Sequence, residues 1–288
     1  FLITLVNRFK TTGIQTGCTS LNPQCNGVIQ MYEGWNEPPG PNPMSTTSFI
    51  TLETDFLNTV RANDPNAQVC SPAFIMWQQS SFYKDLMNDY FQSGLPNTWD
   101  CYDFHINEPT PEEQLADIND FKTVLTNNGI DPATHAIYAT EAGRWGECGV
   151  AISGMTEQAY IARIELLYWS NGIKRHYWYA YDSCGMLTNQ PATQSLNAAG
   201  IGYGNVESWM AGATMSAPCA ASGTVWTCGL SRPNGYQALA VWNTAGSSSY
   251  IQNGTYTKYQ DLEGNTNSIS GSVSIGTEPI LLTNGVAP

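Results

Sequence analysis

The stretch Val28-Ile29-Gln30-Met31-Tyr32-Glu33-Gly34-Trp35-Asn36-Glu37-Pro38 has the pattern that decides the fold. It begins with a short, mostly apolar run, which is typical of a buried β-strand. Polar residues follow and lead to Glu37 and Pro38, so we expect the strand to end there in a turn. A second strand-like segment, His135 to Thr140, runs in the same way into Glu141. The two segments therefore predict two strands that each end in a glutamate.

Strand patterns alternate with helix patterns around these two segments. We predict strands at 28–32, 68–71, 100–105, 135–140 and 173–181. We predict helices at 1–13, 45–63, 79–93, from 110 onward, at 156–172 and at 196–213. Five strands with no short hairpin turn between them indicate a parallel sheet with crossover helices.

The pattern of the sequence changes near residue 214. Short β-rich runs follow, separated by Gly, Ser and Asn, at 224–230, 236–242, 256–262 and 273–282. This pattern predicts a small antiparallel β-sandwich. We therefore predict two domains, a catalytic barrel portion at 1–213 and a C-terminal β-sandwich at 214–288.

The composition restricts the classes of function. The chain has 288 residues with 24 acidic and 11 basic side chains, which gives a net charge of −13. Nucleic acids and anionic membrane surfaces attract basic patches, so neither is expected as a partner. An acidic substrate would also be repelled, which leaves a neutral substrate as the expectation.

The eight cysteines predict disulfides in an oxidising compartment, and therefore a secreted, extracellular protein. No Cys-x-x-Cys motif or Cys/His cluster is present, so no metal site is predicted. Cys18 with Cys25 and Cys219 with Cys228 would each close a short loop, and Cys148 with Cys184 is a third candidate pair. Cys70 with Cys101 would join neighbouring strands, but these two could instead be free buried thiols.

Glu37 and Glu141 together indicate a chemistry. The carboxyl ends of parallel strands meet on one face of a barrel, where such barrels place their active sites. Hydrolysis of a glycosidic bond needs two carboxyl groups on opposite sides of that bond. Two glutamates at strand ends of one barrel supply this arrangement, whereas a single glutamate would more often be a solvated surface charge.

On these residues the chain resembles a known family. Trp35-Asn36-Glu37-Pro38 followed by Thr140-Glu141 is similar to glycoside hydrolase clan A, and the layout with a small C-terminal sandwich resembles family 39 and its relatives. The resemblance implies a (β/α)8 TIM barrel and a retaining glycosidase that needs no cofactor. It implies that Glu37 is the acid/base, that Glu141 is the nucleophile, and that Asn36 holds the sugar 2-hydroxyl group.

The resemblance also implies further substrate-binding residues. His105 matches a residue of the sixth strand that positions the nucleophile, although it could be purely structural. Trp178 or Tyr179 matches the aromatic platform of the eighth strand, and only one of these neighbours can face inward, for which we favour Trp178. Trp35, Trp145 and Glu33 are further candidates for the cleft.

We therefore expect a retaining β-glycosidase that acts on a neutral glycan by double displacement. The two carboxyl groups should be about 5–5.5 Å apart, whereas about 8 Å or more would favour inversion. We expect Glu141 to be ionised and Glu37 to be protonated at the start of the reaction. A non-catalytic carbohydrate-binding protein on a decayed barrel is the alternative from another class.

The number of predicted parallel strands leads to one more expectation. If the strand before Glu37 is the fourth of the barrel, residues 1–13 are the third helix and the strands one to three lie outside this sequence. A barrel unit takes roughly 30 residues, so about 80–100 residues would precede Phe1, with a signal peptide before them. A missing N-terminal segment or a second chain would then complete the barrel.

Overall fold

The computed structural model describes residues 1–10, 29–38, 44–77, 80–144, 154–181, 187–188 and 195–288. Trp145 and the predicted pairs Cys18–Cys25 and Cys148–Cys184 lie outside these residues. The helices and the first five strands follow in the order α1 (Leu2–Phe9), β1 (Met31–Glu33), α2 (Thr46–Asn63), β2 (Gln68–Ile75), α3 (Ser81–Gln92), β3 (Cys101–Glu108), α4 (Gln114–Asn127), β4 (Ala136–Arg144), α5 (Glu157–Ser170), β5 (Ile173–Trp178) and α6 (Ala198–Met210).

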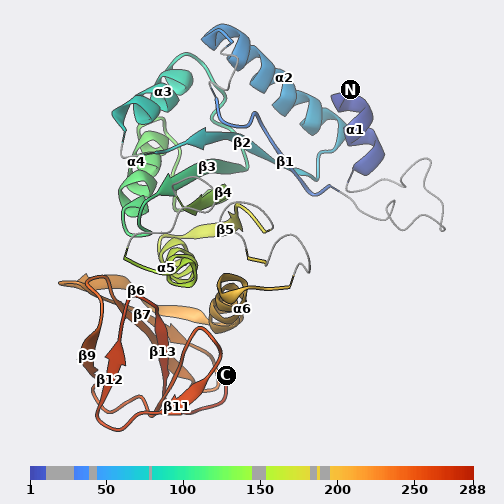
Figure 1. Ribbon diagram of the computed structural model, residues 1–288. Helices are drawn as coiled ribbons and strands as arrows, with labels where there is room; N and C mark the ends of the chain where they lie inside the picture. Colours follow the sequence, from blue (N-terminus) through green and yellow to red (C-terminus); the bar gives the residue numbers. More distant parts are fainter. Residues whose placement is uncertain (11–28, 39–43, 78–79, 145–153, 182–186, 189–194) are drawn as a thin grey trace, which may run out of the picture. The chain divides into compact units, whose positions relative to one another are not determined.

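The strands β1 to β5 form one sheet in sequential order, with helices between successive strands (Figure 1). The pairs β1–β2 and β2–β3 are parallel, as the absence of hairpin turns predicted. Within this described part of the chain the sheet is a half-barrel. The α/β class and the parallel sheet predicted from the sequence are thereby confirmed.

The chain divides into two compact units. The first comprises residues 1–106 and 116–141, and the second comprises residues 107–115 and 142–288. The change from helices to antiparallel strands falls between Met210 and Thr214, inside the second unit. The predicted domain boundary at 213/214 stays a prediction.

The core of the first unit shows which face of the sheet is covered by helices. Phe74 of β2 packs against Phe91 of α3, with ring centroids 5.9 Å apart, and Phe104 of β3 packs against Phe121 of α4 at 5.2 Å. Side chains alternate between the two faces of a strand. Asp103 and His105, the neighbours of Phe104, therefore point away from the helices, toward the barrel interior.

Helix α4 begins where its capping residues place it. The Thr110 N–H donates to Glu113 Oε2 at 3.0 Å, and the Glu113 N–H donates to Thr110 Oγ at 3.4 Å. This reciprocal pair is a capping box. Residues 111–113 form a turn, so the regular helix begins at Gln114 and not at the predicted residue 110.

The C-terminal strands are β6 (Thr214–Ser222), β7 (Val225–Ser231), β8 (Gln237–Asn243), β9 (Ser248–Ile251), β10 (Lys258–Gln260), β11 (Thr266–Ser268), β12 (Ser272–Ile275) and β13 (Ile280–Thr283). They form a six-stranded sheet in the order β11-β10-β13-β8-β7-β6 and a two-stranded sheet of β12 and β9. All pairings are antiparallel.

The larger C-terminal sheet is buried on both faces at β8. Trp242 of β8 belongs to a core that includes Leu166 of α5 and Val206 of α6. Val241, the neighbour of Trp242, belongs to a second core with Val273 of β12. The alternation along β8 thus directs one face toward the helices and the other toward the small sheet.

Two disulfides lie in the described residues, Cys70–Cys101 and Cys219–Cys228. The second joins β6 to β7, as the sequence predicted. The first joins β2 to β3, so of the two alternatives left open for Cys70 and Cys101 the structure has the disulfide and not the free thiols. None of the described helices is both long enough and apolar enough to cross a bilayer.

Candidate active site

The segment after β1 runs along β2 and presents Glu37. The Ala73 N–H donates to Trp35 O, and the Glu37 N–H donates to Ala73 O, each at 3.1 Å. Asn36 forms a parallel bridge with Ala73 between these two bonds. The motif therefore continues the sheet pairing beyond Glu33, and Trp35 and Asn36 are exposed there.

Glu37 has a backbone conformation that non-glycine residues seldom adopt. Its φ angle is +53°, in the left-handed region. Such a conformation costs about 1–3 kcal/mol and persists only where the surroundings hold it. The hydrogen bond between the Glu37 N–H and Ala73 O is one such restraint. Strain of this kind at a strand end is typical of functional sites.

His105 lies against both glutamates. Its Nδ1 atom is 2.8 Å from Glu37 Oε1 and 3.9 Å from Glu141 Oε2. The His105 side chain is only 2% exposed, whereas the side chains of Glu37 and Glu141 are 27% and 29% exposed. The imidazole therefore lies on the buried side of the two carboxyl groups, and its Nδ1 atom forms a hydrogen bond with Glu37. The contact of His105 with Glu141, at 3.9 Å, is the one through which it would position the nucleophile.

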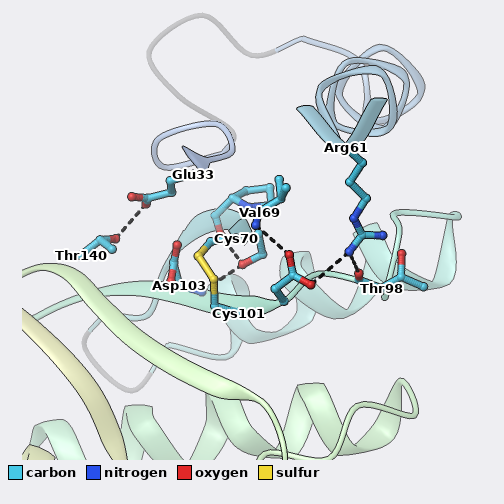
Figure 2. Close-up of a disulfide and its surroundings, with 11 residues drawn as sticks. Glu33, Arg61, Val69, Cys70, Thr98, Cys101, Asp103 and Thr140 are labelled. Atoms are coloured by element: carbon cyan, nitrogen blue, oxygen red, sulfur yellow. Dashed lines mark hydrogen bonds and ion pairs between the residues drawn. A yellow bond between two sulfur atoms is a disulfide. The ribbon is translucent and has the colours of Figure 1, made fainter. Parts of the chain in front are cut away.

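A chain of hydrogen bonds continues from His105 into the interior. Its Nε2 atom is 3.3 Å from Thr140 Oγ1, and the Thr140 hydroxyl donates to Glu33 Oε1 at 2.8 Å (Figure 2). Burial raises the pKa of Glu33. The Thr140 hydrogen bond and His105 lower this pKa, and the Glu141 charge raises it. Glu33, a candidate for substrate binding, thus has its carboxyl group engaged by Thr140.

Glu37 and Glu141 are close enough to act on one bond. One carboxylate oxygen from each and one nitrogen of His105 all lie within 4.8 Å of one another. Burial raises the pKa of Glu141, His105 lowers it and the charge of Glu37 raises it again.

Asp103 is a buried carboxyl group below this site. It is completely buried, and both of its oxygens are without a hydrogen-bond partner among the described residues. Burial first, and then the charge of Glu33, raises the pKa of Asp103 well above its ordinary value. It lies beside the Cys70–Cys101 disulfide (Figure 2).

The position of Trp178 corrects our preference for the aromatic platform. Its ring centroid is 6.1 Å from that of Tyr160 and 6.2 Å from that of His176, and it packs against a cluster that includes Ile161. Trp178 therefore faces helix α5. By alternation Tyr179 points to the other face, and it is 54% exposed. Tyr179 replaces Trp178 as the candidate platform.

Sequence reasoning did not single out Thr140, Asp103 or Glu53. Thr140 stands in the Thr140-Glu141 motif, and Asp103 lies two residues before His105 in the predicted strand 100–105, so alternation could have placed Asp103 on the interior face. Glu53 of α2 has no such signal. It is 1% exposed and accepts a hydrogen bond from the Trp35 N–H at 3.1 Å.

Comparison with known proteins gives structural similarity alone. No protein-family model matches this sequence. No curated protein matches it either. A family 39 glycoside hydrolase from Bacteroides cellulosilyticus WH2 superposes with a TM-score of 0.67 at 13% identity, over 98% of this chain and 60% of that enzyme. This chain therefore spans less than two thirds of that enzyme.

Two further structures have the same architecture. The family 51 arabinofuranosidase from Xanthomonas axonopodis pv. citri has a TM-score of 0.63 at 11% identity, over 98% of this chain and 72% of that one. The Paenibacillus polymyxa xyloglucanase of glycoside hydrolase family 44 has a TM-score of 0.61 at 12% identity, over 98% and 69%. The described chain thus has the fold of glycoside hydrolases of families 39, 44 and 51, which agrees with the resemblance seen in the sequence.

Proposed function

We propose that this chain is the catalytic part of a retaining glycoside hydrolase that cleaves β-linked neutral glycans. The observation that carries the proposal is the placement of the Glu37 and Glu141 carboxylate oxygens within 4.8 Å of each other. Retaining enzymes hold their two carboxyl groups about 5–5.5 Å apart, and inverting enzymes leave about 6.5–9.5 Å for a water molecule. The short gap supports retention.

The role given to each carboxyl group follows the resemblance of the two sequence motifs. Glu37, in its acid form, donates its proton to the leaving oxygen while Glu141 attacks the anomeric carbon. A glycosyl-enzyme ester forms at Glu141 and the alcohol departs. Glu37 then removes a proton from water, which attacks the same carbon and releases Glu141 as carboxylate. His105 contacts both carboxyl groups and holds them in position relative to each other.

Substrate contacts complete the proposal. Asn36 and Trp35 are exposed beside Glu37, and we propose that Asn36 binds the sugar 2-hydroxyl group and that Trp35 contacts a neighbouring sugar. Trp145, outside the described residues, stays a candidate. No cofactor takes part in the proposed reaction. Two carboxylates and an imidazole are also ligands that zinc accepts, so assays should be run with and without a chelator.

Stereochemistry and chemical rescue test the mechanism. Wild-type protein should hydrolyse an aryl β-glycoside and release first the β-anomer, as seen by proton NMR in the early phase. Glu141→Gly should retain less than about 1% of the rate, and azide should restore turnover by forming the α-glycosyl azide. Early release of the α-anomer from the wild type would instead establish inversion. Glycan binding without hydrolysis would establish the carbohydrate-binding alternative.

The substrate can be narrowed with a panel of glycans and aryl glycosides. The similar structures include a xyloglucanase and an arabinofuranosidase. Xyloglucan, linear β-glucans and β-xylans, and aryl α-L-arabinofuranosides as a test of β-specificity, therefore form the first panel. Product sizing would separate endo from exo cleavage.

We further propose that the natural protein is secreted and that additional strands complete the barrel. The two disulfides support an oxidising compartment. β1 and β5 stand at the two ends of the sheet order, and each has only one neighbouring strand in the described part of the chain. Intact mass and N-terminal sequencing of the natural protein would identify a segment or second chain that pairs with these edges.

A further inference from the structure

The Trp35 N–H is the backbone donor that the sheet does not use. This segment bonds to β2 through the Gly34 N–H, which donates to Ser71 O at 3.3 Å, and through Trp35 O and the Glu37 N–H, which both pair with Ala73. The Trp35 N–H donates instead to a side chain of α2. In the described sheet β1 is the first strand in the order, so β2 is its one neighbouring strand there.

Glu53 of α2 is the acceptor for the Trp35 N–H. Its Oε1 atom accepts from the Trp35 N–H at 3.1 Å, and its Oε2 atom has no hydrogen-bond partner among the described residues. The side chain is 1% exposed. Burial of a carboxyl group in the core costs free energy unless hydrogen bonds or a charged partner offset the desolvation.

The backbone of the motif is packed directly on this carboxyl group. A methyl group added at Gly34 would collide with Glu53 Oε2 and would lie 2.9 Å from the Pro72 nitrogen. Only a glycine therefore lets the chain lie so close to Glu53. The segment from Gly34 to Glu37 is held between β2 on one side and Glu53 on the other.

We propose that Glu53 is a positioning residue for the acid/base. Its carboxyl oxygen fixes the Trp35 N–H, and through the backbone it fixes Asn36 and the left-handed conformation of Glu37. This inference rests on the proposed function, because it assigns Glu53 a role in proton donation by Glu37. Glu53 itself does not contact the substrate.

The test uses variants of the full chain and two aryl glycosides of a sugar that the wild type cleaves. Glu53→Leu removes the acceptor, whereas Glu53→Gln keeps an oxygen at the same place. A phenyl glycoside needs its leaving oxygen protonated, and a 2,4-dinitrophenyl glycoside does not. We expect Glu53→Leu to lower kcat/KM at least tenfold for the phenyl substrate and less than threefold for the dinitrophenyl substrate. Glu53→Gln should stay within threefold of wild type for both.

A second readout does not depend on activity. Hydrogen–deuterium exchange of the segment 31–38 should be at least tenfold faster at the Trp35 amide in Glu53→Leu and unchanged in Glu53→Gln. Asp55→Leu, an exposed acidic residue on the same helix, is the matched control and should change neither readout. If Glu53→Leu does not fold, Glu53→Asp, which withdraws the acceptor by one methylene group, takes its place.

The outcomes separate the two proposals. Equal losses with both leaving groups would overturn the assignment of Glu53 to proton donation, and unchanged exchange at Trp35 would overturn its positioning role. If the wild type cleaves neither an aryl glycoside nor a glycan of the panel, the glycosidase proposal fails and the link to proton donation fails with it. The exchange experiment would then still decide whether Glu53 holds the segment.

Discussion

Replacement of Glu53 by glutamine should make the stability of the protein less sensitive to pH. Burial raises the pKa of Glu53 from 4.5 to about 7, and the hydrogen bond from the Trp35 N–H lowers it only in part. The folded state therefore keeps the proton of Glu53 between pH 4.5 and 7, whereas the unfolded state releases it. The unfolded state binds fewer protons in this window, so this group makes the free energy of unfolding fall as pH rises.

The magnitude follows from the pKa difference. A shift of about 2.5 units at about 1.36 kcal/mol per unit corresponds to about 3 kcal/mol. Glutamine resembles the protonated acid in size and in its acceptor oxygen, so Glu53→Gln and wild type should be about equally stable at pH 4.5. At pH 8 the variant should be more stable by about 3 kcal/mol.

Urea unfolding followed by tryptophan fluorescence at pH 4.5, 6 and 8 measures this difference. Other titrating groups act on both proteins and cancel in the comparison. The carboxyl groups that share the pocket wall with Glu53 are Glu33 and Asp55, so Asp55→Asn is the control for loss of one negative charge. A difference between Glu53→Gln and wild type that stays constant within about 0.5 kcal/mol across this range would refute the buried, protonated state of Glu53.

Three further predictions concern other parts of the chain. Burial lowers the pKa of His176, but the charge and hydrogen bond of Glu165, at 2.7 Å, more than offset this and raise it. In urea titrations His176→Gln should therefore destabilise the protein by about 3–5 kcal/mol at pH 5. The loss should be smaller once the pH exceeds the raised pKa of His176 in the folded state. Loss of the Cys219–Cys228 disulfide, with a sequence separation of 9, should cost about 2–3 kcal/mol by the loop-entropy relation, measured with the double alanine variant. His105→Ala should lower kcat about 100-fold with KM nearly unchanged, and an equal effect on KM would indicate a substrate contact instead.

Strand order and strand ends could be predicted from the sequence because they depend on local patterns. Parallel strands end at one edge of a sheet, so Glu37 and Glu141 had to meet once both were placed at strand ends. The closeness of His105 follows in the same way, since it stands near the end of a strand between them.

The rest of the site depends on tertiary packing. Alternation along β5 predicts that Trp178 and Tyr179 face opposite sides of the sheet, but it does not predict which of the two faces the helices. The ion pair of His176 with Glu165 of α5 determines which side faces the helices. His176 lies two residues before Trp178 and therefore on the same side of the strand. Glu53 is a still harder case, because a single glutamate in an amphipathic helix gives no sign that it will accept a backbone N–H from another strand.

The shared core of α5, α6 and the C-terminal sheet has a consequence for how such a chain can evolve. A binding module that recombines freely between enzymes needs a hydrated surface of its own at the junction. Here Leu166, Val206 and Trp242 are buried in one cluster. Separation of the sheet from the helices would expose each of these side chains to water at about 1.5–3 kcal/mol apiece. The last two helices and the sheet should therefore be inherited together, and sequence changes on one side of this cluster should be matched by changes on the other.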